Sequence, residues 1–432
     1  MKKIIYIFLI ISFSFNAYSQ EILSFRKAIE NLLLNNYSIR LSKINQQIAN
    51  NNVIPGKAGM APKVDLTSSY TMSNTEIELD LATGQKIINS GNTTKTYNAG
   101  IQISQTLFDG LAMFVNYDKL EEFKNKSDIE LKITIEGAVQ SLASAYIQAL
   151  KLQNTLQTLK KNLELSNDRL QRLEIKKDYG AALQLEVLRA KVDKNTDSSN
   201  YLKTELSYRN AIKNINFLMG NNIEASFTLD TFKVDEVKEL AAIREDAKMN
   251  NSSILRAISN KQISEYDKKL VLSTFFPRIS LVGGYTVSGQ EADAGFILLN
   301  QSNGVSGTLS FNWNLYNGKQ DEINRQNAEL AIKMNEITEE QLRQQIDLNV
   351  LNNYDTYTRR LEILKFEKEN LATAQLNFER TQELFNTGLA TSLELRQAQL
   401  NLNSSEIKII EAELDTIQSL IDLKILSGEK LL

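Results

Sequence analysis

The chain has 432 residues, of which 42% are hydrophobic and only 3 are proline, and its formal net charge is -3. It contains no histidine and no cysteine, so it cannot build a Ser-His-Asp triad, a cysteine nucleophile, a thiolate or imidazole metal site, or a disulfide. We therefore expect no catalytic residue, no metal and no cofactor, and the lack of any Lys/Arg-rich run argues against a nucleic-acid partner.

The first residues follow the pattern of a secretory signal peptide. Two lysines precede an apolar run over residues 4–11, and Ala-Tyr-Ser at 17–19 forms a small-residue cleavage site. The apolar run is shorter than the roughly 17 residues that a membrane-spanning helix needs, which favours cleavage over an uncleaved anchor. We expect residues 1–19 to be a signal peptide, the mature protein to begin at Gln20, and any membrane insertion to use strands.

The two halves of the chain repeat one another. The segment 61–66 (APKVDL) corresponds to 276–281 (FPRISL), and 107–110 (LFDG) corresponds to 315–318 (LYNG). The halves differ in length only between these motifs, where residues 73–96 and 288–304 are expected to form surface loops. A fixed order of motifs with variation confined to loops indicates an internal duplication.

Alternating apolar and polar residues predict one pair of strands in each half. The predicted pairs are 62–72 with 97–108 and 277–288 with 305–316. Each run is about 10 residues long, enough to cross a bilayer when tilted. A half-buried soluble sheet is the alternative, but no helical pattern lies between the strands of a pair to cover the apolar face. The aromatic residues in position to form interfacial girdles are Trp313, Tyr70, Tyr97, Tyr285 and Tyr316.

Glycine-poor and proline-free tracts predict long helices. The interval from Gly110 to Gly180 equals that from Gly318 to Gly388, and corresponds to about 105 Å of helix. Heptad spacing in the last tract indicates coiled-coil packing. The predicted long and return helices are 110–178, 182–219, 318–386 and 391–427. Further helices near 21–52 and 235–274 complete the repeats 20–220 and 235–432, with 221–234 as an equatorial segment between them.

Four strands from one chain cannot close a barrel, and open strand edges are not tolerated in lipid. Several chains must therefore pool their strands. Two copies give eight strands with a filled interior, whereas three give twelve strands with room for a polar lumen. The polar alternate face of the strands favours three copies.

Taken together, these elements resemble the TolC-like outer membrane efflux protein family of Gram-negative bacteria, over the whole mature chain. Single motifs such as Phe108-Asp109-Gly110 are weak, and the specificity lies in their order and spacing. The resemblance implies an α+β membrane protein. Its fold is a homotrimeric twelve-stranded outer membrane β-barrel, with four strands per chain, that continues into a long periplasmic α-helical barrel.

The same resemblance implies a passive exit channel that is gated at its periplasmic tip and surrounded by outer membrane lipid. Its partners are a periplasmic adaptor protein and an inner membrane transporter of the RND, ABC or MFS type. The helix turns at Gly180 and Gly388, with Leu389 and Thr391, are the expected tips and adaptor docking positions.

Acidic residues ring the entrance in this family, and Glu394 matches the first of these positions. Where a second acid is expected the chain has Gln397, so the ring is expected to be weaker than in relatives. Glu186 occupies the position of Glu394 in the first repeat, which makes a two-tier collar conceivable. The alternative for each glutamate is a solvated charge on an exposed helix face.

Three other interpretations share some of these features. A periplasmic coiled-coil adaptor (membrane fusion) protein is exported and rich in long helices, but it lacks two alternating strand pairs. A fibrous adhesin shares the heptads but not the equal intervals. A carboxylate-dependent hydrolase would use pairs such as Glu121-Glu122 or Glu339-Glu340, but adjacent residues on a helix point about 100° apart and do not share a site.

Overall fold

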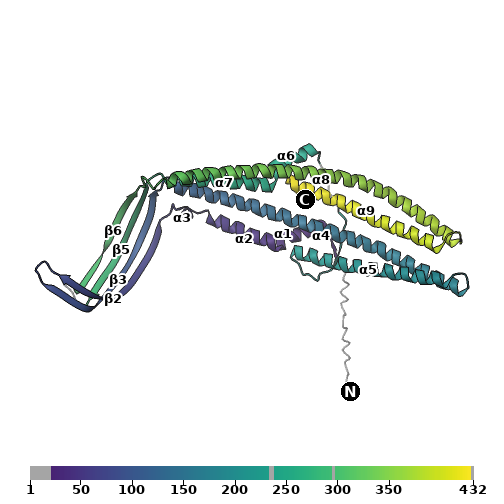
Figure 1. Ribbon diagram of the computed structural model, residues 1–432, viewed down its shortest axis with the longest axis horizontal. Helices are drawn as coiled ribbons and strands as arrows, with labels where there is room; N and C mark the ends of the chain where they lie inside the picture. The colour runs from purple at the N-terminus through teal and green to yellow at the C-terminus, as the bar shows by residue number, and fades with distance from the viewer. Residues whose placement is uncertain (1–20, 233–237, 294–296, 430–432) are drawn as a thin grey trace, which may run out of the picture. The chain divides into compact units, whose positions relative to one another are not determined.

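The computed structural model describes residues 21–232, 238–293 and 297–429 (Figure 1). The predicted signal peptide 1–19 lies outside the described residues. The chain divides into two compact units. One is built from the chain up to Leu41, from Ile133–Asn251 and from the chain after Gln345, and the other from Ser42–Lys132 and Ser252–Gln345.

The second unit contains a four-stranded antiparallel sheet. Its order is β2-β3-β5-β6, so the central contact joins a strand from each half of the chain (Figure 1). Within the described part of the chain, β2 and β6 each have a partner on one side only. The strands are β2 Lys63–Asp80, β3 Lys86–Phe108, β5 Arg278–Ala292 and β6 Leu299–Asn312.

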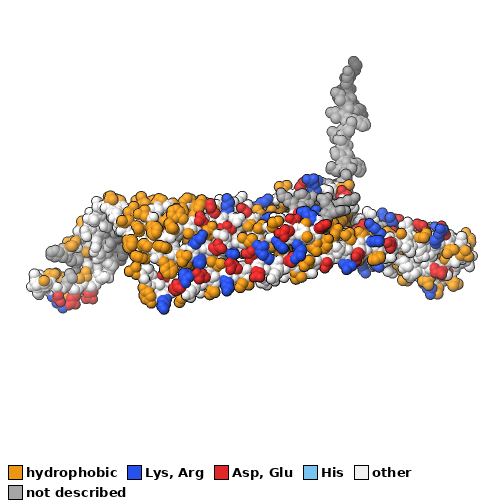
Figure 2. Space-filling model, turned by 90° about the horizontal axis from the view of Figure 1, so that it is seen from above, with side chains coloured by type: hydrophobic (Ala, Val, Ile, Leu, Met, Phe, Trp, Pro, Cys, Tyr) orange, Lys and Arg blue, Asp and Glu red, His pale blue; other side chains and the backbone are white. Residues whose placement is uncertain are grey.

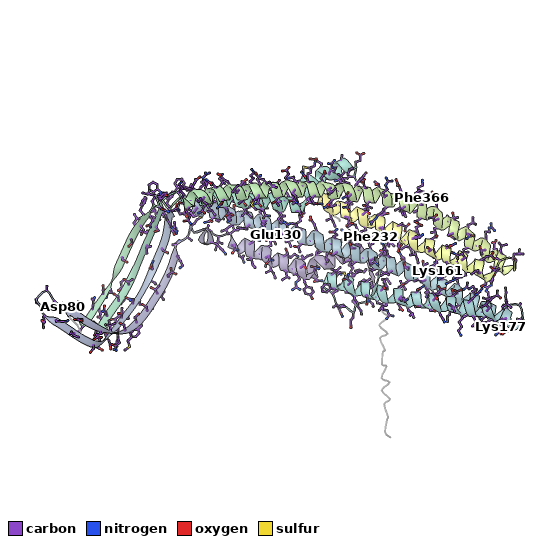
Figure 3. All side chains as sticks on the ribbon, in the orientation of Figure 1. Asp80, Glu130, Lys161, Lys177, Phe232 and Phe366 are labelled. Atoms are coloured by element: carbon purple, nitrogen blue, oxygen red, sulfur yellow. The ribbon has the colours of Figure 1, made fainter. Side chains whose placement is uncertain are left out.

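The first hairpin is longer than the sequence predicts, and the expected loop 73–96 is wrong. Most of it is strand: Ser73 pairs with Thr94, and pairing continues as far as Asp80 and Lys86 (Figure 3). Only residues 81–85 form the turn, where the Leu81 N–H donates to the Gln85 carbonyl at 3.0 Å. Backbone hydrogen bonds between antiparallel strands do not depend on which side chains the strands carry. The strands therefore continue beyond the residues that alternate between apolar and polar.

The second hairpin also differs from its prediction, because β5 and β6 extend into the expected loop 288–304 and β6 ends at Asn312 rather than at 316. Trp313 follows the strand directly, and its indole N–H donates to the Phe275 carbonyl at 3.1 Å. This bond ties the residue after β6 to the segment that leads into β5.

Small residues allow β3 and β5 to approach closely at the centre of the sheet. A Cβ at Gly284 would lie 2.6 Å from the backbone oxygen of Ile101, a distance that real Cβ atoms do not show. At the neighbouring Gly283 the nearest atom would be 3.8 Å away, which is ordinary contact. The pairing of the two halves of the sheet therefore requires a glycine at 284 but not at 283.

Two pairs of helices have equal lengths in the two halves of the chain. The long helices α4 Ala112–Asp178 and α8 Gln320–Asn386 have 67 residues each, and the return helices α5 Gln184–Met219 and α9 Ser392–Ser427 have 36 each. The long helices start in the same way. The Asp109 side chain accepts a hydrogen bond from the Met113 N–H at 3.2 Å, and the Asn317 side chain accepts one from the Asp321 N–H at 3.4 Å.

Two predicted helices are each interrupted by an asparagine. In place of single helices near 21–52 and 235–274, the structure has α1 Phe25–Asn35, α2 Tyr37–Asn52 and the short α3 Pro55–Ala58 in the first half, and α6 Leu240–Asn250 and α7 Ser252–Ser273 in the second. Asn36 donates its side-chain amide to the Leu218 carbonyl at 2.8 Å, and Asn251 donates to the Leu426 carbonyl at 3.0 Å. Each break therefore satisfies a carbonyl at the end of a return helix.

The equatorial segment contributes a small core in the first unit. Its strand β4 Phe227–Leu229 pairs in parallel with β1 Glu21–Leu23. Tyr146 of α4 is fully buried and packs edge-on against the stacked rings of Phe25 and Phe232, and its hydroxyl lies 2.7 Å from the Leu23 carbonyl oxygen. Burial raises the pKa of the Tyr146 hydroxyl well above its usual value. The sequence pattern gave no sign of this parallel pair.

The close approach at Gly284 gives a direct test of the sheet. Gly284→Ala forces β3 and β5 apart, because the clash is with backbone and no rotamer relieves it, and overpacking of this kind costs about 1–3 kcal/mol. Gly283→Ala is the matched control, and we expect it to be close to neutral. Thermal unfolding of the two purified variants, followed by circular dichroism, should show a lower melting temperature for Gly284→Ala alone. Equal melting temperatures would contradict the register.

Candidate functional site: the helix turns and their caps

Each long helix turns back at a glycine in the left-handed region. Gly180 has φ 72° and Gly388 has φ 80°, which only glycine adopts without strain. The residue after each glycine closes the turn, since the Ala181 N–H donates to the Lys176 carbonyl at 2.7 Å and the Leu389 N–H donates to the Leu384 carbonyl at 2.8 Å. The predicted tips are thus two hairpins, α4–α5 and α8–α9, with the same C-terminal closure.

Glu394 forms a complete capping box with Thr391 at the start of α9. The Glu394 carboxylate accepts hydrogen bonds from the Thr391 N–H at 2.7 Å and from its hydroxyl at 2.8 Å, and the Glu394 N–H donates back to that hydroxyl at 3.2 Å. These bonds lower the pKa of Glu394 below its ordinary value of 4.5. Its stabilising effect is present above that ordinary value and is lost as the pH falls through the lowered pKa.

Glu186 holds the equivalent position in α5, but its box is incomplete. Its carboxylate accepts from the Leu183 N–H at 2.9 Å, while the leucine side chain offers no acceptor in return. The exposed Gln397 donates to the Asn401 side chain at 3.0 Å, along its own helix. The structure therefore places both glutamates at the N-terminus of a return helix, each with its carboxylate turned back on that terminus.

Exposed apolar residues surround both turns. Tyr179 is 85% exposed and Leu389 is 78% exposed, and Leu183 and Leu393 are also exposed. Of these four, the sequence analysis assigned only Leu389 to the docking positions and counted Leu393 in the heptad of the last helix, although all lie within five residues of a turn glycine. Apolar side chains gathered at an exposed turn are typical of an interaction surface.

A buried polar cluster lies one to two turns into α9, and the sequence gave no indication of it. Arg396 is 7% exposed and reaches Asp197 of α5 through two hydrogen bonds of 2.8 Å each. Arg169 of α4 pairs with Asp193 of α5. Gln399 donates to the Asn162 carbonyl of α4 at 3.2 Å. Charged residues along helices are usually solvated, so only the tertiary contact of three helices identifies these as buried.

Comparison with known proteins identifies the family. The model of the outer membrane efflux protein family matches residues 28–221 and residues 243–429, one stretch in each half of the chain. The chain belongs to the outer membrane efflux protein family. This efflux protein is 19% identical to "Outer membrane protein TolC" of Salmonella enteritidis over 438 residues, covering 99% of the chain and 86% of TolC.

Solved structures agree in fold. The CusC structure superposes with a TM-score of 0.76 at 16% identity, covering 94% of this chain and 92% of that one. The open state of the Neisseria gonorrhoeae MtrE outer membrane channel superposes with a TM-score of 0.73 at 16% identity, covering 94% and 89%. The mixed fold of long helices and a partial-barrel sheet is therefore the fold of outer membrane efflux channels.

Family membership decides between the interpretations left open by the sequence. The protein is an outer membrane exit channel rather than a periplasmic adaptor, and the proteins of this family are channels rather than enzymes. Among the described residues, no helix combines the length and the apolar character needed to cross a membrane.

The complete capping box of α9 and the incomplete one of α5 predict opposite changes in helix stability when one residue of each is replaced. Thr391→Ala removes the reciprocal cap of α9, which costs helix stability of about 1 kcal/mol. Leu183→Thr supplies the missing acceptor in α5 and should stabilise that helix by a similar amount. Hydrogen exchange of the first turns should become faster in α9 for Thr391→Ala and slower in α5 for Leu183→Thr. Unchanged exchange in both would mean that the boxes do not hold the turns.

Proposed function

We propose that three copies of this chain form the exit channel of a tripartite efflux system. In this assembly β6 of one copy pairs with β2 of the next, so that three four-stranded sheets close into one twelve-stranded barrel. The observation that carries the proposal is the sheet itself, whose long strands have unpaired edges at β2 and β6 within the described chain. A closed barrel is the arrangement that removes such edges in lipid.

The side chains of the sheet fit a lipid-facing surface. One face carries exposed apolar residues from all four strands, with exposed tyrosines among them, and two further exposed aromatic residues follow the end of β6. The exposed apolar residues include Leu66, Ile101, Leu281, Val305, Leu309 and Phe311, and the aromatic ones are Tyr70, Tyr285, Trp313 and Tyr316. Outer membrane lipid is the proposed neighbour of this face.

The helices support assembly in the same way. Apolar side chains lie exposed among the charged ones (Figure 2), and on α2, α5 and α8 they recur at spacings of three, four or seven residues, apart from a gap of ten between Val192 and Leu202. Such spacing forms a seam that packs against another helix. The seams are Tyr37, Leu41, Ile44 and Ile48 on α2; Leu185, Leu188, Val192, Leu202 and Leu206 on α5; and Ile323, Leu330, Met334 and Ile337 on α8. We assign these seams to contacts between copies.

In the assembled channel the tips face the periplasm and the barrel hairpins face the cell exterior. The turns at Gly180, Gly388, Leu389 and Thr391, with their exposed apolar neighbours, are the proposed docking surface for a periplasmic adaptor. An inner membrane transporter supplies the energy, since this chain contains no G-x-x-x-x-G-K-[ST] nucleotide motif. The repeats 20–220 and 235–432 are the two halves of the proposed duplication, with 221–234 between them.

Orientation and assembly can be tested together in cells. An epitope inserted between Thr83 and Gly84, in the β2–β3 turn, should be labelled on intact cells. The same epitope after Ala181, in the α4–α5 turn, should be labelled only after the outer membrane is permeabilised. The protein should extract in detergent as a trimer that forms channels in planar bilayers. A soluble periplasmic monomer, or labelling in the reverse order, would overturn the proposal.

The proposed aperture consists of Glu394, Glu186 and Gln397. Three copies of Glu394 around a threefold axis would favour cations at the tip. Glu394→Gln removes this charge but keeps a capping side chain, because glutamine also serves in capping boxes. Bilayer recordings should show lower cation selectivity and several-fold weaker block by a trivalent cation, with a smaller effect for Glu186→Gln. Glu362→Gln, at an exposed pair on α8, is the control. An unchanged reversal potential in Glu394→Gln would remove this residue from the aperture.

A further inference from the structure

A cavity lies where the strands of the second unit meet its helices (Figure 1). Its volume is about 790 Å³, within the range of sites that bind small organic molecules. The lining comes from α3, the start of α4, the end of α7, and the ends of β3, β5 and β6 that lie next to the helices. All of these segments belong to one compact unit. We call this space the junction cavity.

Two cations line the junction cavity without a carboxylate partner. Arg278, at the start of β5, donates to the Thr106 hydroxyl at 3.3 Å. Lys57 of α3 donates its ammonium to the Asn52 side chain at 2.7 Å. Both partners are uncharged, and in the part of the chain that the structure describes neither cation forms an ion pair. Their charges are therefore available to a ligand.

The two halves of the chain differ at Arg278. The segment 61–66 corresponds to 276–281, so the counterpart of Arg278 is Lys63. Lys63 lies 2.9 Å from the carboxylate of Asp65, but the residue in the place of Asp65 is Ser280. The second half thus keeps the cation at the start of its strand and lacks the acid that neutralises it in the first half.

Arg278 is also the unbalanced charge on its face of the sheet. It pairs with Asn312 across β5 and β6, and side chains alternate, so both lie on the face opposite Leu281. Over the length that the four strands share, the other charges on this face are Lys63 and Asp65, which pair with each other. In the proposed channel this face lines the lumen, and the junction cavity lies on the path of the exported molecule.

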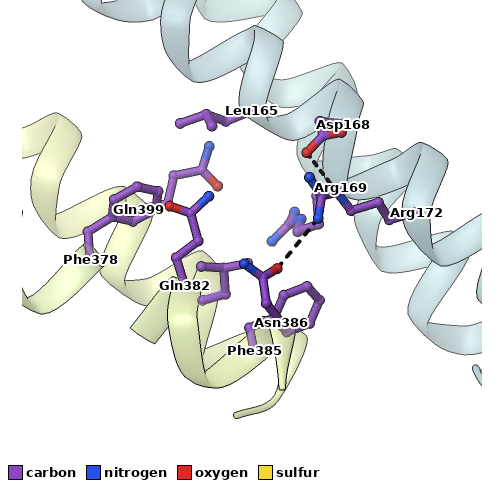
Figure 4. A pocket seen from close by; sticks show the side chains of 10 residues that line it. Leu165, Asp168, Arg169, Arg172, Phe378, Gln382, Phe385, Asn386 and Gln399 are labelled. Carbon is purple, nitrogen blue, oxygen red and sulfur yellow. Dashed lines mark hydrogen bonds and ion pairs between the residues drawn. The ribbon is translucent and has the colours of Figure 1, made fainter. Parts of the chain in front are cut away.

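The smaller cavity beside the α8 turn offers neither room nor charge. It has a volume of about 30 Å³ and is lined by the residues shown in Figure 4, among them Arg169 and Arg172. That volume is the share of about one water molecule. The Arg172 guanidinium lies 2.9 Å from the Asp168 carboxylate. Arg169 pairs with Asp193. Of these two cavities, the junction cavity is the one suited to an organic ligand.

We propose that the junction cavity binds the anionic group of an organic molecule, with Arg278 and Lys57 as its cationic ligands. The planar guanidinium suits a carboxylate, sulfonate or phosphate, and the ammonium adds a point charge. Phe276 and Ala112 line the same cavity and give the rest of the molecule an apolar surface. The proposal rests on the channel argued above and names a class of exported molecule, organic anions with an apolar part.

Block of the open channel measures the site, with naphthalene-1,3,6-trisulfonate as the probe. We expect this anion to block the wild-type trimer in planar bilayers. Arg278→Gln should raise the half-blocking concentration roughly tenfold, because a charge-assisted contact is lost, and Lys57→Gln should raise it less. Lys63→Gln is the matched control, since it removes the same charge from the same face outside the cavity. No block, or equal effects of Arg278→Gln and Lys63→Gln, would overturn the proposal.

Asp109 allows a test in the opposite direction. Its carboxylate lines the junction cavity and caps α4 through the Met113 N–H, and Asn317 caps α8 in the same way. Asp109→Asn therefore keeps the cap while it removes the negative charge nearest to a bound anion. The half-blocking concentration of the trisulfonate should fall several-fold. A half-blocking concentration that stays the same or rises would contradict binding in this cavity.

Calorimetric titration of the purified protein separates this proposal from the channel. The wild-type protein should bind the trisulfonate, and Arg278→Gln should bind it more weakly, whether or not the trimer conducts. A trimer that binds the anion but never conducts counts against the channel alone. A trimer that conducts but does not bind it counts against the cavity alone. Inorganic phosphate that binds as tightly as the trisulfonate would overturn the assignment to organic anions.

Discussion

The unpaired backbone groups along the outer edges of β2 and β6 determine how the sheet of this protein can enter a membrane. Each edge strand presents a row of N–H and C=O groups that find no partner within the described chain. In water they are solvated, but in hydrocarbon each costs several kcal/mol. With strands of 18 and 14 residues, one copy cannot enter a membrane alone. Assembly and insertion are therefore coupled in the proposed channel, and the exposed seams of α2, α5 and α8 are the proposed contacts between its copies.

Equivalent residues begin and end the equivalent helices in the two halves of the chain. Asp109 and Asn317 cap the long helices, and Gly220 and Gly428 end the return helices where a Cβ would meet the backbone of Asn35 or Asn250. The halves differ in the cap of the return helix, which is complete at Thr391 and half-formed at Leu183. A shared scaffold thus carries two hairpins whose tips are held with different strength.

Some elements of this fold could be predicted from the sequence and others could not, for physical reasons. The long helices and their turns could be predicted because the tracts lack proline and are poor in glycine, and because glycine alone suits the left-handed turns. The ends of the strands could not be predicted, because backbone pairing continues beyond the residues whose apolar alternation is typical of a lipid-facing strand. Asn36 and Asn251 lie inside helical patterns, and their breaks depend on carbonyls of distant helices. The burial of Arg396 likewise depends on partners from two other helices.

The polar chemistry of the contact between the hairpins does not follow from stability alone. An apolar interface of similar volume is often as stable as a buried ion pair or more so, so stability alone does not explain arginine and aspartate at this place. An apolar interface that opens exposes its surface to water at a cost that grows with area. Charged groups that part are hydrated instead, which offsets the loss of their pairing. The α4–α5 hairpin thus has an apolar core of its own, while its contact with Arg396 of α9 consists of charged groups that water can also satisfy.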